Sequence, residues 1–195
     1  MQADQYLGID KEYTSEFRSL GSKFYGCLFP VDGIQDFEAR IKEFKTKYAD
    51  ATHVCAACVI GTDKSYQRFS DDGEPSNSSG RPILYALLSS ELTYVGCAVV
   101  RYYGGKKLGI PGLIEAYGGA AQLCTKSAQS SVLTLKENII CTIDPGFSYL
   151  LYNFIARKNL TYKMTPSGEF NIACNQSMTS ELREELKKID TLVIY

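Results

Sequence analysis

The sequence predicts an α+β protein built from two domains, and three observations support this. The chain has 195 residues, of which 45% are hydrophobic and 22% charged, a balance that is ordinary for a soluble globular protein and sufficient for two small cores. Segments with the periodicity of strands and of helices alternate along it. The alternation restarts near Lys136, so we place a boundary within residues 131–137 and expect domains at residues 1–134 and 135–195.

The first domain is expected to be a sheet accompanied by helices. One helix is predicted by apolar residues at alternating spacings of three and four, namely Ile34, Phe37, Ile41, Phe44 and Tyr48. The run at residues 93–102 is nearly continuously apolar, which indicates a central strand. In chain order we expect strands at 23–31, 52–60, 66–69 and 93–102, and helices through 34–48, 81–90 and 113–128.

The second domain is expected to have the ferredoxin-like order βαββαβ, which fits into about 60 residues. Its first helix is predicted by an apolar stripe that follows the turn Asp144-Pro145-Gly146 and contains Phe147, Leu150, Leu151, Phe154 and Ile155. We expect strands at 138–143, 160–165, 169–175 and 191–195, and a second helix at 180–189.

Bulk composition excludes several classes of protein. The net charge of −1 gives no overall field that would attract nucleic acid or an anionic membrane, so any nucleic-acid site has to be a local patch. We find no apolar run of signal-peptide or transmembrane length, and the seven cysteines are scattered and odd in number. These features predict a cytoplasmic protein with reduced thiols and no membrane partner.

Two loops of the first domain concentrate charge. The acidic loop, residues 68–76, and the start of the following helix contribute Arg68, Asp71, Asp72, Glu74 and Arg81. The basic loop, residues 101–109, and the residues just after it contribute Arg101, Gly104, Gly105, Lys106, Lys107, Gly109 and Gly112. Glycines allow backbone N–H groups to approach an anion closely, and a following helix adds the positive end of its dipole. The basic loop is therefore a candidate site for phosphate or another anion.

A purely structural interpretation of the same loops stands beside this one. The three carboxylates of the acidic loop would then pair with Arg68, Arg81 and Arg101 and brace two long loops. The basic loop lacks the spacing of a P-loop and of a dinucleotide fingerprint, which disfavours ATP and NAD. We therefore predict no cofactor.

Catalytic chemistry has few candidates. Cys55 and Cys58 lie an odd number of positions apart on a predicted strand, so they face opposite sides and do not share a metal ion. A dyad of Cys55 with His53, and a divalent cation on the acidic loop, are alternatives that we rank below packing and ion pairing. Tyr102 and Tyr103 offer rings for base stacking. We predict no catalytic residue and no metal ligand.

Four ordered segments resemble the IMPACT/YigZ family: R-F-S-D-D-G-E-P-S at residues 68–76, G-R-P-I-L at 80–84, R-Y-Y-G-G-K-K-L-G at 101–109 and G-L-I-E-A-Y at 112–117. The matching covers most of residues 20–128. The resemblance implies a first domain like the second domain of a small-subunit ribosomal protein, and a second domain similar to the C-terminal domain of elongation factor G. It also implies a role near translation, since the eukaryotic members regulate initiation through stress-kinase signalling.

The chain departs from the family pattern near the proposed anion site. Where relatives usually have G-T-G-G, this chain has Gly109-Ile110-Pro111-Gly112, which removes one hydroxyl and one N–H. Lys107 keeps the family lysine, and Lys106 replaces a residue that is usually apolar.

From residues and resemblance together we predict a translation-associated binding protein that docks on RNA, on the ribosome or on a translation-regulatory protein. Arg101, Lys106 and Lys107 would contact phosphate, while the acidic loop positions them. One alternative is a metal-dependent, phosphate-handling hydrolase that uses the acidic loop. Another is a protein–protein adaptor, which the near-neutral charge suggests and which would bind with little salt dependence.

Overall fold

The computed structural model describes residues 4–195. It forms two compact units, one of residues Tyr6–Leu133 and one of Thr134–Tyr195 together with Asp4 and Gln5. No helix in the described part of the chain is long and apolar enough to cross a membrane. The predicted classes of element, α+β in two parts, are confirmed.

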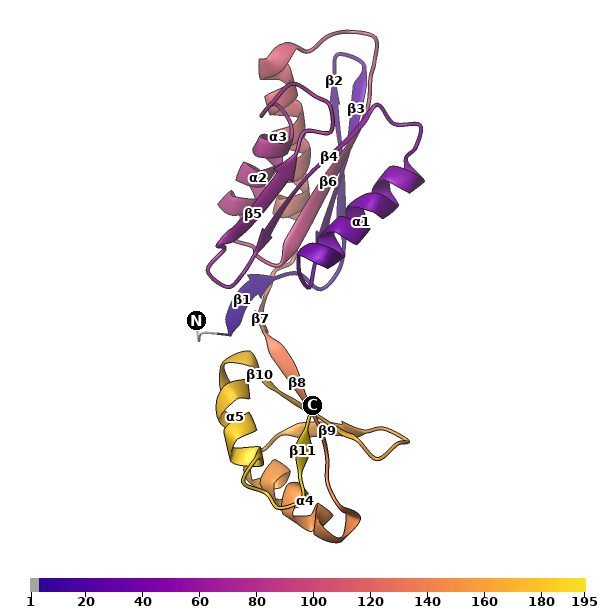
Figure 1. Cartoon of the computed structure of the whole chain (residues 1–195). Helices are drawn as coiled ribbons and strands as arrows, with labels where there is room; N and C mark the ends of the chain where they lie inside the picture. The colour runs from indigo at the N-terminus through magenta and orange to yellow at the C-terminus, as the bar shows by residue number, and fades with distance from the viewer. Residues whose placement is uncertain (1–3) are drawn as a thin grey trace. The chain divides into compact units, whose positions relative to one another are not determined.

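The Tyr6–Leu133 unit is built on a five-stranded antiparallel sheet of order β2-β3-β6-β4-β5 (Figure 1). The predicted central strand is β6. β1 and β7 pair as a separate two-stranded sheet. The elements are β1 (Gln5–Gly8), β2 (Tyr13–Ser19), β3 (Ser22–Pro30), α1 (Ile34–Lys47), β4 (His53–Ile60), β5 (Tyr66–Ser70), α2 (Gly80–Ser89), β6 (Val95–Tyr102), α3 (Gly109–Ser127) and β7 (Ser131–Thr134).

Helices cover both faces of this sheet, so its central strands are apolar on both sides. Cys55 and Val59 of β4 pack in the core with α2 and α3. Val54 and Cys58 pack in the opposite core with Phe44 of α1. Figure 1 shows α2 and α3 on one side of the sheet and α1 on the other. The prediction that Cys55 and Cys58 face opposite sides is confirmed.

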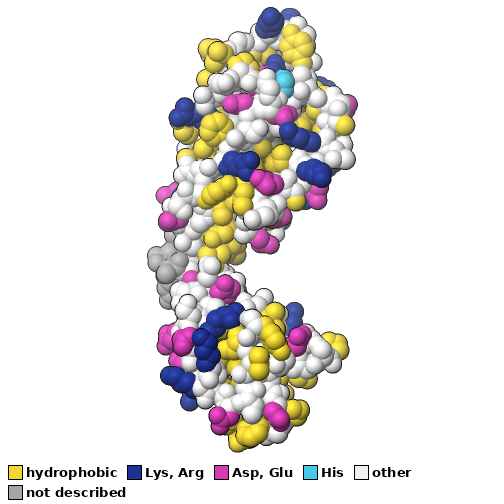
Figure 2. All heavy atoms as spheres, viewed as in Figure 1, with side chains coloured by type: hydrophobic (Ala, Val, Ile, Leu, Met, Phe, Trp, Pro, Cys, Tyr) yellow, Lys and Arg dark blue, Asp and Glu magenta, His cyan; other side chains and the backbone are white. Residues whose placement is uncertain are grey.

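The surface of this unit carries charges of both signs. Figure 2 shows lysine and arginine side chains interspersed with carboxylates on the visible face, with hydrophobic side chains between them. Charges of both signs, as in the composition, are therefore present on this face of the unit.

Two predictions for this unit need correction. Strands β1, β2 and β7 were not predicted. β2 is an edge strand whose residues alternate between half-buried and exposed, so few of its side chains are apolar and the sequence pattern of a strand is weak. Helix α3 begins at Gly109 and not at residue 113. Pro111 lies in the first turn of this helix, where its missing N–H has no intrahelical partner to lose.

The other unit has a four-stranded antiparallel sheet of order β11-β8-β10-β9. Its chain order is the predicted βαββαβ, and its core lies between the sheet and both helices, with Ile139 opposite Ile172 on the inner face. The elements are β8 (Lys136–Thr142), α4 (Ser148–Arg157), β9 (Thr161–Met164), β10 (Phe170–Asn175), α5 (Thr179–Leu186) and β11 (Val193–Ile194), with short 3₁₀ turns at Pro145–Phe147 and Gln176–Met178.

Candidate functional site

A buried ion pair joins the acidic loop to the basic loop. Arg101, at the end of β6, places Nη1 2.5 Å from Oε1 of Glu74, and the two side chains are 7% and 5% exposed. The hydroxyl of Tyr117, from α3, donates to the same Oε1 at 2.8 Å. Nε2 of His53 lies 3.9 Å from it. We call these four residues the buried polar centre.

The position of Arg101 changes its expected role. Its guanidinium carbon lies 5.5 Å from the ring centres of both Phe24 and Tyr103, so aromatic rings cover it. Its Nε is buried and has no hydrogen-bond partner within residues 4–195. A buried guanidinium bonded to Glu74 is not free to bind phosphate at the surface. We therefore assign Arg101 to bracing the two loops, in agreement with the structural interpretation of the sequence.

Asp71 organises the start of α2. Its carboxylate accepts hydrogen bonds from the backbone N–H groups of Asn77 (2.8 Å), Ser79 (3.1 Å) and Gly80 (2.8 Å), and from the Ser79 hydroxyl (2.7 Å). Asn77 takes the left-handed conformation, with φ 62°, which brings its N–H toward the carboxylate. Burial opposes the charge of Asp71, but these donors outweigh burial and lower its pKa.

Replacing Asp71 by alanine is expected to reduce the free energy of unfolding by about 0.5–2 kcal/mol, the usual effect of losing a helix cap. Because the pKa of Asp71 is lowered in the folded state, its contribution is complete above the ordinary value of 3.8 and is lost as the pH falls through the folded pKa. Urea titrations at pH 7 and pH 3 test this: Asp71→Asn should flatten the pH dependence, and an unchanged acid profile would contradict it.

Asp72 supports the start of β4. Its Oδ2 accepts from the N–H of Val54 at 2.7 Å, and its Oδ1 pairs with Lys45 of α1. Its carbonyl lies 2.7 Å from Nδ1 of His53. All three acidic-loop carboxylates are thus bonded to protein donors, and the described residues contain no group of three or more His, Cys, Asp and Glu side chains placed to hold a metal ion.

The Cys55–His53 dyad is not supported. The Cys55 thiol donates to the carbonyl of Asp71 at 3.1 Å, while His53 contacts Asp72. Burial raises the pKa of Cys55 to about 12, so the thiol stays protonated and weakly nucleophilic at neutral pH.

The two remaining arginines lie apart from the acidic-loop carboxylates. Arg68 pairs with Glu38 of α1. Arg81 is exposed at the start of α2, with its guanidinium 5.8 Å from the ring centre of Tyr85. Of the three arginines that were predicted to pair with the acidic-loop carboxylates, only Arg101 forms such an ion pair within the described residues.

The basic loop is held close to the β2–β3 turn and presents two lysines to solvent. The N–H of Gly104 donates to the Ser22 hydroxyl at 3.1 Å, and a Cβ at Gly104 would lie 1.9 Å from the carbonyl carbon of Gly21. Lys106 and Lys107 are exposed, and neither forms an ion pair within residues 4–195. Gly109 and Gly112, the other predicted anion-site glycines, lie in the first turn of α3.

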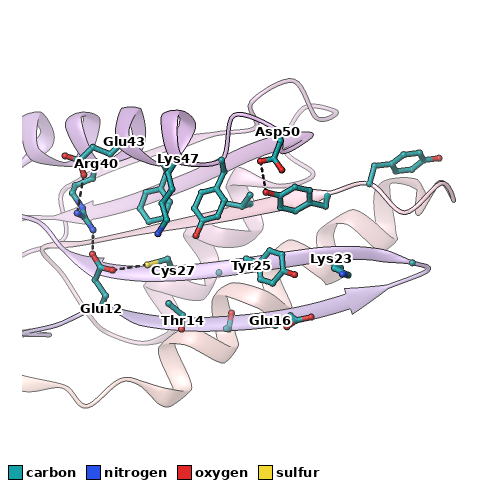
Figure 3. Close-up of a pocket in the computed structure, with 18 residues that line it drawn as sticks. Glu12, Thr14, Glu16, Lys23, Tyr25, Cys27, Arg40, Glu43, Lys47 and Asp50 are labelled. Carbon is teal, nitrogen blue, oxygen red and sulfur yellow. Dashed lines mark hydrogen bonds and ion pairs between the residues drawn. The ribbon is translucent and has the colours of Figure 1, made fainter.

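A groove beside α1 was not predicted. It has a volume of about 970 Å³ and lies between α1 and the strands β2 and β3 (Figure 3). We call it the β2–β3 groove; its lining includes Glu12, Thr14, Glu16, Gly21, Lys23, Tyr25, Cys27, Arg40, Glu43, Lys47, Tyr48, Asp50, Tyr102 and Tyr103. Because Tyr102 and Tyr103, which belong to the basic loop, are among its lining residues, the groove adjoins that loop.

Fold and loops thus define a two-domain α+β protein with a braced, glycine-rich basic loop. The family model of the Impact N-terminal domain matches residues 20–125, more than half of the chain. The chain belongs to the IMPACT family.

Individual relatives agree with this assignment. An IMPACT family member of Haemophilus influenzae is 41% identical over 113 residues, which cover 57% of this chain and 55% of the relative. The IMPACT family member YigZ of Escherichia coli K12 is 41% identical over 100 residues, covering 50% of this chain and 49% of YigZ. The matched part thus spans about half the length of these relatives. A crystal structure of a hypothetical protein superposes with a TM-score of 0.73 at 24% identity over 98% of this chain and 96% of that one, which shows the fold alone.

Proposed function

We propose that this protein is a translation-associated binding protein that docks on RNA, including ribosomal RNA, through its basic loop. The proposal rests on Lys106 and Lys107, which are exposed, form no ion pair within the described residues and lie in the same loop as Tyr103, whose side chain is 46% exposed. Ammonium groups bind phosphate and an exposed ring stacks on bases, a combination that suits single-stranded nucleic acid.

The anchoring of the loop supports the same function. Arg101 is bonded to Glu74 directly before the loop, and Gly104 packs against the β2–β3 turn. Two fixed points so close to the lysines limit the conformational entropy that the loop would lose on binding. The chain belongs to the IMPACT family, and its resemblance to that family implies a role near translation. This favours RNA or the ribosome as the partner.

The test is sedimentation of ribosomes through a sucrose cushion at low and at moderate salt. We expect the protein to co-sediment at low salt and to be released as salt rises. The variant Lys106→Glu/Lys107→Glu should be released at a lower salt concentration than the wild type. Two lost phosphate contacts should also reduce the slope of log affinity against log salt by about 1.4. Arg101 is unsuitable for this test because replacing a buried charge also perturbs folding.

A matched control distinguishes the effect of losing the loop lysines from the effect of changing the net charge of the protein. Lys126→Glu/Lys163→Glu makes the same charge change at two exposed lysines outside the loop and the groove, and should sediment like the wild type. Co-sedimentation of the loop variant with the salt dependence of the wild type would overturn the proposal. Binding that ignores salt would point to the protein–protein adaptor instead.

A further inference from the structure

The strand β9 has backbone groups that no neighbouring strand uses. It lies at the edge of the sheet β11-β8-β10-β9, where it forms a hairpin with β10 (Figure 1). The N–H of Thr165 donates to the carbonyl of Glu169 at 2.9 Å, and hydrogen-bonded positions alternate along an antiparallel pair. Lys163 therefore bonds to β10, whereas the N–H and C=O groups of Tyr162 and Met164 point away from it. Each of these two residues offers one donor and one acceptor to a further strand.

An apolar surface adjoins these free groups. Tyr162 and Met164 share one face of β9 because they are two residues apart. The ring of Tyr152, from α4, lies 5.9 Å from that of Tyr162, and both rings pack on Phe170 at 5.5 and 5.6 Å. Tyr149 lies one turn earlier on α4, on the same side as Tyr152. We call Tyr149, Tyr152, Tyr162 and Met164 the β9 patch; their side chains are between 40% and 58% exposed.

The opposite face of β9 carries a cation. Side chains alternate across a strand, so Lys163 points away from the β9 patch. It is exposed and forms no ion pair within residues 4–195. Glu169 of the same hairpin accepts hydrogen bonds from the hydroxyls of Thr165 and Ser167 instead. In an added antiparallel strand, the residue opposite Lys163 is at a non-hydrogen-bonded position, where facing side chains are closest. An acidic side chain there pairs with the lysine.

The same lysine disfavours a second copy of this chain as the occupant. Two β9 strands that pair antiparallel through the free groups of Tyr162 and Met164 place Lys163 directly opposite its counterpart. Like charges directly opposite each other destabilise a strand pair, and a lysine on an exposed edge is a common protection against self-pairing. The charge that opposes self-pairing thus selects an acidic partner.

We propose that β9 binds an extended segment of a partner protein as a fifth strand of this sheet. A carboxylate of the segment lies opposite Lys163, and the apolar residues on either side of it pack on the β9 patch. Backbone hydrogen bonds hold the segment, and the pattern apolar–acidic–apolar gives selectivity. The inference goes beyond the proposed function and does not depend on it, since β9 and the basic loop belong to different units.

The first experiment measures the binding of short labelled peptides to the full chain by fluorescence anisotropy. In each peptide valine alternates with threonine, and the central threonine is kept or replaced by glutamate or lysine. Affinity should fall from glutamate to threonine to lysine, by about 1.5- to 5-fold at each step. Lys163→Glu should reverse this order. Lys126→Glu makes the same charge change in the other unit and should keep the order of the wild type.

The β9 patch has its own variant and a matched control. Tyr149→Ser should weaken binding of the glutamate peptide by about 5-fold, because it removes a ring from the patch. Tyr85→Ser makes the same change at a tyrosine of similar exposure on α2, in the other unit, and should bind like the wild type.

Amide hydrogen exchange, followed by NMR on the unaltered protein, tests the added strand itself. With the glutamate peptide bound, the amides of Tyr162 and Met164 should exchange more slowly, whereas that of Lys163, which is already bonded to β10, should change less. If no peptide slows the first two amides, or if the three peptides bind equally, the inference is wrong. If these amides become protected without peptide as the protein concentration rises, the occupant is a second copy and the inference is also wrong. Each of these results leaves RNA binding by Lys106 and Lys107 to be decided by its own test.

Discussion

Replacing Arg101 by leucine is expected to lower the free energy of unfolding of the Tyr6–Leu133 unit by about 3–5 kcal/mol. The substitution removes the cation and leaves the Glu74 carboxylate, whose side chain is 5% exposed, without a countercharge. The hydrogen bond from Tyr117 remains but does not compensate for a buried charge. The free energy of unfolding should fall by an amount near the upper end of this range, because the side chains of Arg101 and Glu74 are both nearly inaccessible to water.

Native-state hydrogen exchange gives the readout for one unit at a time. Amides of β4 and β6 should exchange faster in Arg101→Leu, whereas amides of β8 and β10, in the other unit, serve as an internal reference. The second variant, Arg101→Leu/Glu74→Gln, removes the orphaned charge and should recover a large part of the loss. If the double variant is no more stable than Arg101→Leu, the ion-pair explanation is wrong.

The elements that were predictable are those with strong local patterns. α1 follows from its apolar spacing, and β4 and β6 follow from apolar runs that pack on both faces. β2 could not be found in this way, because two of its four half-buried positions, Ser15 and Ser19, are polar and interrupt the apolar alternation. The turn that joins β2 to β3 has positive φ values at both central residues, 45° at Leu20 and 83° at Gly21. Such turns usually have Asn-Gly or Asp-Gly at these positions, and Leu-Gly does not give that sequence signal.

The candidate site was predictable in part. Charge and glycine content identified both loops as candidate sites. In the structure the ion pair between Arg101 and Glu74 joins the two loops. The burial of Arg101 could not be predicted from the sequence, because Phe24, one of the rings that cover it, is far away along the chain and comes opposite Arg101 only when β3 pairs with β6. The β2–β3 groove was hidden for a similar reason: its lining comes from β2, β3, α1 and β6, and no single segment carries its signature.

Gly104→Ala is expected to destabilise the Tyr6–Leu133 unit by about 3 kcal/mol, the upper end of the usual effect of overpacking. The new Cβ would lie 1.9 Å from the carbonyl carbon of Gly21 and 2.3 Å from the backbone nitrogen of Ser22. Both are backbone atoms, so rotation of a side chain does not relieve the clash. The basic loop has to move away from the β2–β3 turn, and we expect RNA affinity to fall with it because Lys106 and Lys107 lose their fixed position.

Gly105→Ala is the matched control for Gly104→Ala. Gly105 has φ 82°, and a Cβ added there would have no neighbouring atom within 4 Å, so alanine meets only the left-handed backbone penalty of about 1–2 kcal/mol. Urea unfolding and RNA anisotropy on both variants separate the two causes. A larger loss at Gly104 than at Gly105 would show that contact with the β2–β3 turn holds the loop, whereas equal losses would mean that backbone conformation alone sets its shape and that the turn does not position the lysines.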